Sequence, residues 1–113
     1  MTWFVYLLEC ENGKIYTGIT TDVTRRFDEH LKGTGAKFTR ANPPLHILAF
    51  KPVTSRSEAS SIEYHVKRLK PSQKRELGDI WNGKNVIDLG DNYSMKIPHL
   101  QFPESVVFGW VIE

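Results

Sequence analysis

The strongest constraint on the fold is an Asn-Gly pair at positions 12 and 13, between two runs of strand-forming residues. Residues 3–9 and 15–20 are rich in β-branched and aromatic side chains. An Asn-Gly between two such runs is a strong short-range signal of a β-hairpin. Tyr6 and Tyr16 lie one on each predicted strand, so the register of the hairpin decides whether the two phenols share a face.

Two registers are compatible with this turn. A two-residue loop would put the tyrosines on opposite faces of the sheet. A three-residue loop, with a type I turn, Gly13 in the left-handed region and a bulge, would pair Cys10 with Lys14 and put Tyr6 opposite Gly18. We favour the three-residue loop, because both tyrosines then share a face and Gly18 leaves space beside the phenol. The other face then forms an apolar surface of Trp3, Val5, Leu7, Ile15 and Ile19.

A helix running to about residue 32 is predicted next, in which Thr20 and Thr21 with Asp22 form the N-cap and an acidic first turn. Its apolar stripe is Val23, Phe27 and Leu31. At 100° per residue, His30 lies in the middle of that stripe and Arg26 at its edge. One inward histidine is usually structural, but an inward histidine and arginine one turn apart favour a functional site.

The later chain predicts a third strand and a second helix. Residues 45–50 are typical of a strand, and Ser55 with Glu58 forms a capping-box pattern, with Ser57 as the alternative start. The buried face of this helix is predicted to be Ala59, Ile62, Val66 and Leu69. Glu63 borders that stripe, where a carboxylate is usually solvated or paired. From residue 78 onward turn signals dominate, and residues 105–112 predict a closing strand.

Composition indicates one ordinary domain with an uneven charge. The chain has 113 residues, 40% of them hydrophobic, with no apolar run of membrane-spanning length, and we expect no leader peptide and no membrane partner. Its single cysteine cannot form an internal disulfide, which favours a cytoplasmic location. Residues 1–77 carry 13 Lys and Arg against 8 Asp and Glu, whereas residues 78–113 carry 2 against 5. The first part therefore favours a polyanionic partner.

The polar residues singled out above suit phosphodiester hydrolysis better than other chemistries. The sequence shows no zinc-ligand spacing, no phosphate-binding glycine loop and no nucleophile–histidine–acid arrangement. A single carboxylate at a helix edge suits Mg²⁺, which keeps most of its waters. An arginine and a hydrated Mg²⁺ stabilise charge in phosphoryl transfer. A tyrosine beside His and Arg can activate water if its pKa falls well below about 10.

These residues together resemble a known family. Val5-Tyr6 and, ten residues on, Tyr16-Thr17-Gly18, followed by Arg26, His30 and Glu63, resemble the GIY-YIG nuclease domain, and most of all its short stand-alone bacterial members. The resemblance covers about residues 2–77. The chain has Phe-Val-Tyr and Tyr-Thr-Gly where the name-giving motifs have Gly-Ile-Tyr and Tyr-Ile-Gly, and these changes keep both tyrosines and the second glycine.

The resemblance implies an α+β fold, a small three-stranded antiparallel sheet flanked by helices. Residues 1–77 would form the nuclease domain, and residues 78–113 an extension, packed on it, with one or more further strands. Tyr6 would be the base or its relay, and Tyr16 would position water or phosphate. Arg26 would hold the scissile phosphate and His30 would tune a tyrosine. Glu63 would bind a single Mg²⁺ or Mn²⁺ ion.

The expected function is a metal-dependent DNA endonuclease that hydrolyses phosphodiesters in one step, with DNA repair or recombination as its expected context and RNA as an alternative substrate. Basic residues expected to bind the nucleic acid are Lys37, Arg40, Lys67 and Lys74. One alternative is a nucleic-acid-binding module with this fold and little or no turnover. Another is an interaction domain that dimerises through residues 78–113. The sequence indicates no oligomeric state.

Overall fold

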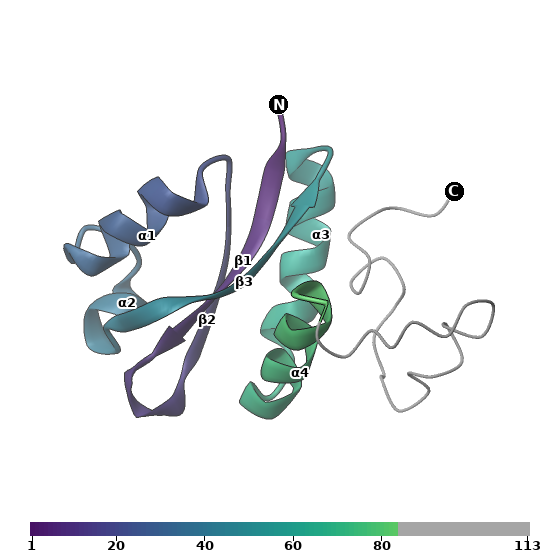
Figure 1. The fold of residues 1–113 in the computed structure, drawn as a ribbon. Coiled ribbons are helices and arrows are strands. Elements are labelled where there is room, and N and C mark those ends of the chain that lie inside the picture. Colours follow the sequence, from purple (N-terminus) through teal and green to yellow (C-terminus); the bar gives the residue numbers. More distant parts are fainter. Residues whose placement is uncertain (84–113) are drawn as a thin grey trace.

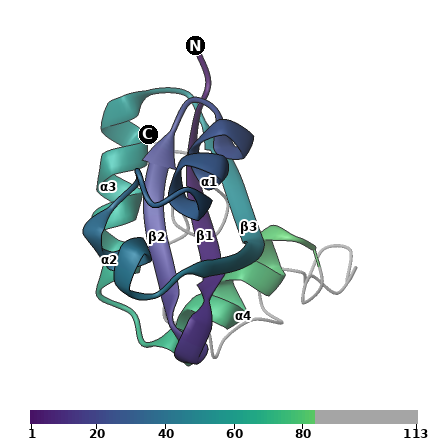
Figure 2. The same cartoon turned by 90° about the vertical axis from the view of Figure 1, so that its left-hand side faces the viewer.

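The computed structural model describes residues 1–83 and confirms the α+β class, with a three-stranded antiparallel sheet between two layers of helices (Figure 1). Helices α1 (Val23–Leu31) and α2 (Lys37–Ala41) lie on one face of the sheet, and α3 (Arg56–Lys67) and α4 (Pro71–Trp81) on the other, as Figures 1 and 2 show together. The predicted strand at 105–112 and any other strand of the extension lie outside the described residues.

The sheet has the order β2-β1-β3, so the first strand of the hairpin is central. β1 spans Trp3–Cys10, β2 Ile15–Thr20 and β3 Pro44–Val53. β3 is longer than the predicted 45–50 and contains two prolines, Pro44 and Pro52. Proline is tolerated in an edge strand because a missing N–H on the outer side breaks no ladder bond.

The three-residue hairpin loop is confirmed by the strand pairing. Tyr6 lies opposite Gly18 and Leu8 opposite Tyr16, and the Cys10 amide donates to the Lys14 carbonyl at 2.8 Å. The loop conformation differs from the predicted type I turn, because position 12 also has a positive φ of 65°. Asparagine is one of the few residues that adopts this region readily, so both loop residues at 12 and 13 are left-handed.

Helix α1 begins where predicted, although Asp22 is its N-cap and its first turn has no acidic residue, and its buried stripe differs from the prediction at the C-terminal end. The Asp22 side chain accepts a hydrogen bond from the Arg25 amide and caps the helix. His30 is 1% exposed, as expected for the middle of the stripe. Leu31 was predicted to face inward and this was wrong, since it is 53% exposed. It is the last helical residue, one position past His30, and this 100° step turns it away from the sheet.

The second layer holds the main hydrophobic core. Side chains of β1 and β2 that point away from the tyrosine face pack there against α3 and α4, together with Ala49 and Val53 of β3. Ser55 caps α3 by accepting from the Glu58 amide, but the Glu58 carboxylate bonds to Thr54 rather than completing the predicted box. Ala59, Ile62 and Val66 are buried as predicted. Leu69 packs on this core from beyond the helix end.

Helix α4 crosses the predicted division between residues 77 and 78. Gly78 and Ile80 are buried on the same helix as Leu77, so the core-forming unit extends at least to Trp81. The division into a domain and an extension stays a prediction. Because α4 continues through residues 77 and 78, a boundary between the two parts would have to lie after Trp81. Arg75 of this helix binds both carboxylate oxygens of Glu9 on β1, which ties α4 to the hairpin.

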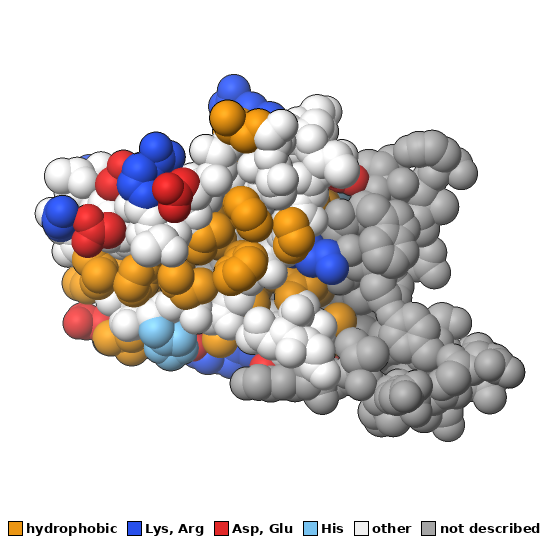
Figure 3. Space-filling view, turned by 45° about the horizontal axis from the view of Figure 1, so that its top comes forward, with side chains coloured by type: hydrophobic (Ala, Val, Ile, Leu, Met, Phe, Trp, Pro, Cys, Tyr) orange, Lys and Arg blue, Asp and Glu red, His pale blue; other side chains and the backbone are white. Residues whose placement is uncertain are grey.

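Strand β3 carries large hydrophobic side chains that are exposed to solvent. Figure 3 shows hydrophobic side chains gathered in a band, and the exposed large hydrophobic residues include Leu45 and Phe50 of β3. The Phe50 ring contacts that of Phe4 edge to face, with centroids 5.7 Å apart. Within residues 1–83, no helix has the length and apolar character needed to cross a membrane.

The contact between Glu9 and Arg75 gives a test of how α4 is held. Replacing Glu9 with Gln removes the carboxylate and keeps the shape of the side chain. We expect the free energy of unfolding to fall by about 1 kcal/mol, because a two-pronged, partly buried contact exceeds the surface median. Urea unfolding followed by circular dichroism measures this change.

The matched control is Lys32→Ala, which removes an exposed pair with Asp28 at 2.8 Å. This variant should change the free energy of unfolding by less than about 0.5 kcal/mol. Equal losses in the two variants would show that the Glu9 contact contributes no more than an ordinary surface pair.

Candidate active site

Four of the five predicted site residues meet on the α1 side of the sheet. The rings of Tyr6 and Tyr16 are 6.2 Å apart between centroids, and His30 lies 6.0 Å from the first and 4.9 Å from the second. The hairpin register brings the phenols to one face, and the position of His30 on the inner side of α1 points the imidazole at them. Phe38 of α2 closes the cluster against Tyr16, at 5.7 Å.

A chain of hydrogen bonds runs inward from Tyr6. Its hydroxyl lies 2.9 Å from Nε2 of His30, and Nδ1 of the same ring lies 2.7 Å from the Thr39 hydroxyl. The Thr39 hydroxyl donates to the Ala36 carbonyl at 2.9 Å. The Thr39 oxygen is therefore available to accept from Nδ1–H, and this assigns Nε2 as the acceptor for the Tyr6 proton.

One contact favours the opposite tautomer of His30. The Ala36 amide lies 3.5 Å from Nδ1, and it would need Nδ1 to accept. This distance is at the outer limit of a hydrogen bond, whereas the two bonds of Thr39 are of ordinary length. The Nδ1–H tautomer therefore satisfies the stronger contacts.

Two glycines allow these side chains to approach the backbone. A Cβ at Gly18 would lie 2.5 Å from the Tyr6 hydroxyl, and one at Gly35 would lie 2.4 Å from Nδ1 of His30. Both distances are far inside van der Waals contact. The site therefore packs directly on two backbone positions that have no side chain.

Burial is the main cause of the pKa shifts of Tyr6 and His30. It raises the pKa of the Tyr6 phenol, with a smaller contribution from Tyr16, and outweighs the opposing effect of Arg26. The condition stated from the sequence, a Tyr6 pKa well below its usual value, is therefore not met in this structure. Burial also lowers the pKa of His30, and the nearby Arg26 cation lowers it further. The resting pair is thus a neutral phenol and a neutral imidazole.

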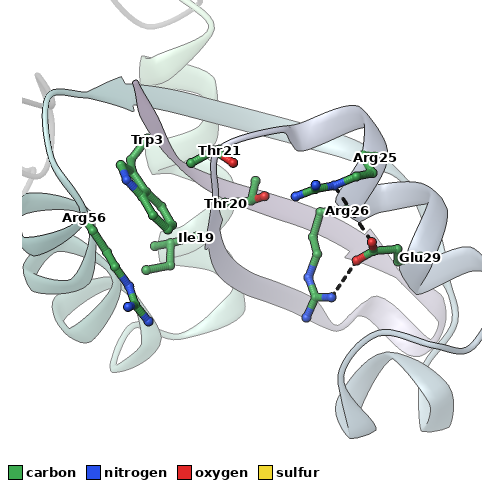
Figure 4. Close-up of a pocket in the computed structure, with 8 residues that line it drawn as sticks. All are labelled: Trp3, Ile19, Thr20, Thr21, Arg25, Arg26, Glu29 and Arg56. Atoms are coloured by element: carbon green, nitrogen blue, oxygen red, sulfur yellow. Dashed lines mark hydrogen bonds and ion pairs between the residues drawn. The ribbon is translucent and has the colours of Figure 1, made fainter. Parts of the chain in front are cut away.

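Arg26 connects the buried pair to the surface. Its guanidinium interacts with the Tyr6 phenol and donates to Glu29 at 2.8 Å, and its side chain is 32% exposed. It also lines a surface pocket between α1 and the start of α3 (Figure 4). Arg26 is thus positioned to reach an anion in the pocket and the buried phenol at once.

Glu63 comes from the opposite layer of the fold, on α3. Its carboxylate acts on the Tyr6 phenol through space and raises the pKa of that group slightly. It pairs with Lys67 at 3.1 Å, and the side chain is 22% exposed. Residues 1–83 contain no cluster of three His, Cys, Asp or Glu side chains that could enclose a metal. A partly exposed single carboxylate fits Mg²⁺, which needs only one or two protein ligands.

The four predicted nucleic-acid contacts differ in how available they are. Lys37 and Arg40 are exposed on α2, although Arg40 also donates to the Gly35 carbonyl at 3.2 Å. Lys67 is the partner of Glu63. Lys74 is partly buried and donates to the Ile15 carbonyl at 3.3 Å, and burial lowers the pKa of its amine. Lys74 therefore has less freedom to bind phosphate than the other three.

Several residues of this region were not predicted from the sequence. Thr39 and Gly35 contact His30, but nothing in their spacing indicates that α2 folds back onto α1. Glycines that follow a helix, such as Gly33 and Gly35, ordinarily indicate only where that helix ends. Arg56 and Trp3 border the same pocket as Arg26, although they are 30 and 23 positions away from it in sequence.

Comparison with known proteins gives a consistent result. Residues 2–76 match the family model described as the GIY-YIG catalytic domain. A UPF0213 protein of Cupriavidus necator is 53% identical over 73 residues, which cover 65% of this chain and 79% of that protein. A UPF0213 protein of Vibrio cholerae is 50% identical over 76 residues, covering 66% and 75%.

Among solved structures, the solution NMR structure of a UPF0213 protein from Bacillus halodurans is 41% identical. The match covers 80% of this chain and 98% of that one, with a TM-score of 0.47.

The hydrogen bonds of Thr39 predict the outcome of its replacement. In Thr39→Val, Nδ1–H of His30 loses its acceptor, so we expect the ring to shift to the Nε2–H tautomer, in which Nδ1 accepts from the Ala36 amide. Imidazole ¹⁵N chemical shifts report this change directly. The variant also loses both hydrogen bonds of the Thr39 hydroxyl, one buried and one partly buried, which should cost about 1–2 kcal/mol of stability. Thr39→Ser is the control, and an unchanged tautomer in Thr39→Val would contradict the assignment.

Proposed function

Because the chain belongs to the GIY-YIG catalytic domain family, whose members include nucleases, we propose that it is a metal-dependent endonuclease that hydrolyses phosphodiester bonds in DNA. The observation that carries the proposal is the directed hydrogen-bond chain from Tyr6 through His30 to Thr39. It provides a place for the proton that an attacking water must lose. The cut proceeds in one step, without a covalent intermediate.

Tyr6 is suited to relaying this proton. Its raised pKa means that the phenol is not ionised in the resting protein, so it can take a proton from water only while it passes its own to His30. The lowered pKa of His30 keeps the imidazole neutral and able to accept. Thr39 and the Ala36 carbonyl then hold the Nδ1–H side of the ring in place as the imidazole becomes charged.

Tyr16 and Arg26 contact the substrate in this proposal. Tyr16 is only partly buried, unlike Tyr6, so its phenol can position water or a phosphate oxygen. The Arg26 fork is held by Glu29 and faces the pocket, which suits it to bind the scissile phosphate. The positive charge of Arg26 stabilises the negative charge that develops on the phosphate in the transition state.

Glu63 is the residue that would hold a divalent ion. The ion, when bound, supplies Lewis-acid stabilisation to the phosphate and the leaving oxygen. Binding requires the Glu63 carboxylate to exchange or share its contact with Lys67. Mg²⁺ or Mn²⁺ fits a single carboxylate with water as the remaining ligands.

Three finer points belong to the same proposal. The substrate is DNA, with RNA as the alternative, since both present the same phosphodiester. The protein acts in the cytoplasm, and its context is DNA repair or recombination. The competing function is nucleic-acid binding without turnover, and a salt-dependent affinity with no cleavage would support it.

Replacement of the site residues tests catalysis. We expect Tyr6→Phe, Arg26→Ala and Glu63→Ala each to lower kcat at least about 100-fold, since each removes a proton-transfer or charge-stabilising group. Cleavage of labelled duplex, nicked, branched and single-stranded DNA with Mg²⁺ or Mn²⁺ measures this, and a chelator should abolish it. Exposed residues of the same types on α3 and at its end provide controls, Tyr64→Phe and Arg68→Ala.

Circular dichroism separates lost chemistry from lost folding. Tyr6→Phe leaves Nε2 of His30 without its donor and should cost about 1–2 kcal/mol, which is a fraction of the stability of a typical domain. If the folded wild-type protein cuts none of these DNA forms with either metal, the endonuclease proposal fails.

The acid limit of activity follows from the pKa of His30. Its neutral form accepts the Tyr6 proton, and its pKa lies below the ordinary value of 6.5. The neutral form therefore persists at pH 6.5, and kcat/KM should fall only as the pH drops through the lowered pKa. NMR titration of the His30 ring should give the same midpoint. An acid limb above pH 6.5 would contradict the role of His30 as the acceptor.

A further inference from the structure

The basic pocket that Arg26 faces extends away from α1, and its far wall takes no part in the chemistry described above. It has a volume of about 290 Å³ and lies between α1 and the first turn of α3 (Figure 4). Three of its eight lining residues are arginines, Arg25, Arg26 and Arg56, and Glu29 is the one acidic residue. The lining therefore carries a net positive charge and suits an anion.

The three arginines are not equivalent. Glu29 pairs with Arg26 at 2.8 Å and with Arg25 at 3.9 Å, so its single negative charge is shared between them. Arg56 pairs with no carboxylate among residues 1–83. Its guanidinium lies over the Trp3 ring, 5.6 Å from the centroid. Stacking on a ring occupies the face of a guanidinium and leaves its N–H edge for an anion.

The direction of these side chains places the pocket on the path of a substrate strand. Figure 4 shows Arg26 and Arg56 extending from opposite walls toward the same open side. Arg56 and Glu63 are seven residues apart on α3, so they lie on the same face, about 10 Å apart along the helix axis. A strand that passes Glu63 can therefore also reach Arg56.

We propose that this pocket is a second phosphate site, in which Arg56 binds another phosphate of the strand that is cut. The separation from Glu63 corresponds to about three nucleotides of B-form DNA or fewer. Trp3 provides an apolar surface for the adjoining sugar or base, and Arg26 borders both sites. This inference rests on the proposed function, because the first phosphate is the one held at Arg26.

The test compares Arg56→Ala with Arg68→Ala, a matched control. Arg68 is the C-cap residue at the other end of α3, and its guanidinium lies over the Tyr64 ring at 5.4 Å from the centroid. Fluorescence anisotropy with labelled duplex, single-stranded and branched DNA, in chelator so that nothing is cut, gives affinities over a range of salt concentrations. Cleavage of the same DNA with Mg²⁺ gives kcat and KM.

We expect Arg56→Ala to weaken binding about 10-fold and to reduce the slope of log affinity against log salt by about one. Its kcat should stay within about 2-fold of wild type, because Arg56 does not touch the reacting atoms. Arg68→Ala should match wild type in all of these quantities. Arg56→Lys, which keeps the charge but loses the planar fork, should lie between wild type and Arg56→Ala.

The outcomes separate this inference from the proposed function. If wild type cuts DNA and Arg56→Ala binds as tightly as wild type, the second phosphate site alone is wrong. If wild type binds DNA without cutting and Arg56→Ala binds about 10-fold more weakly, the enzyme proposal fails and the phosphate site stands. Equal losses in Arg56→Ala and Arg68→Ala, or no binding by wild type, would overturn the site.

Discussion

The hydrogen bond between the Tyr6 hydroxyl and Nε2 of His30 is the contact on which the candidate site depends. It joins the central strand to α1 inside an environment that excludes water. Burial makes both ionised forms costly, so the two groups rest as neutral partners with one proton between them. The arrangement works only because the hairpin register turns both tyrosines to the helix side, and because Gly18 and Gly35 leave room for the two rings.

The sequence predicted those parts of the fold that local chemistry determines. The Asn-Gly turn and the two helix caps each depend on residues a few positions apart, and the hairpin register and the hydrogen bond from the Glu58 amide to Ser55 formed as predicted. Angular spacing also placed His30 correctly. The errors arose where local rules allow two answers, as at position 12, where asparagine adopts the left-handed region, and at the end of α1, where an apolar Leu31 faces solvent.

Tertiary placement was beyond the reach of spacing arguments. Thr39 orients His30 only because α2 folds back onto α1. Arg56 and Arg26 line one pocket only because α3 begins near α1 in the folded chain. Neither arrangement can be predicted from the periodic spacing of residues along the sequence. The pKa of Tyr6 also depends on tertiary burial. Arg26 lowers this pKa, as its proximity in the sequence analysis suggested, but burial in the folded chain raises it by more. Family resemblance supplied the site residues, and only the folded geometry shows how they can share a proton.

The division of the site between two layers has a consequence for newly made chains. Tyr6, Tyr16 and His30 lie within the first 30 residues, whereas Glu63 belongs to a helix that packs on the other face of the sheet. A nascent chain that has emerged only as far as α1 or α2 lacks the Glu63 carboxylate and also the part of the core that β3, α3 and α4 supply to the hairpin. Under the proposed function, the polypeptide becomes able to damage DNA only after α3 has left the ribosome and docked.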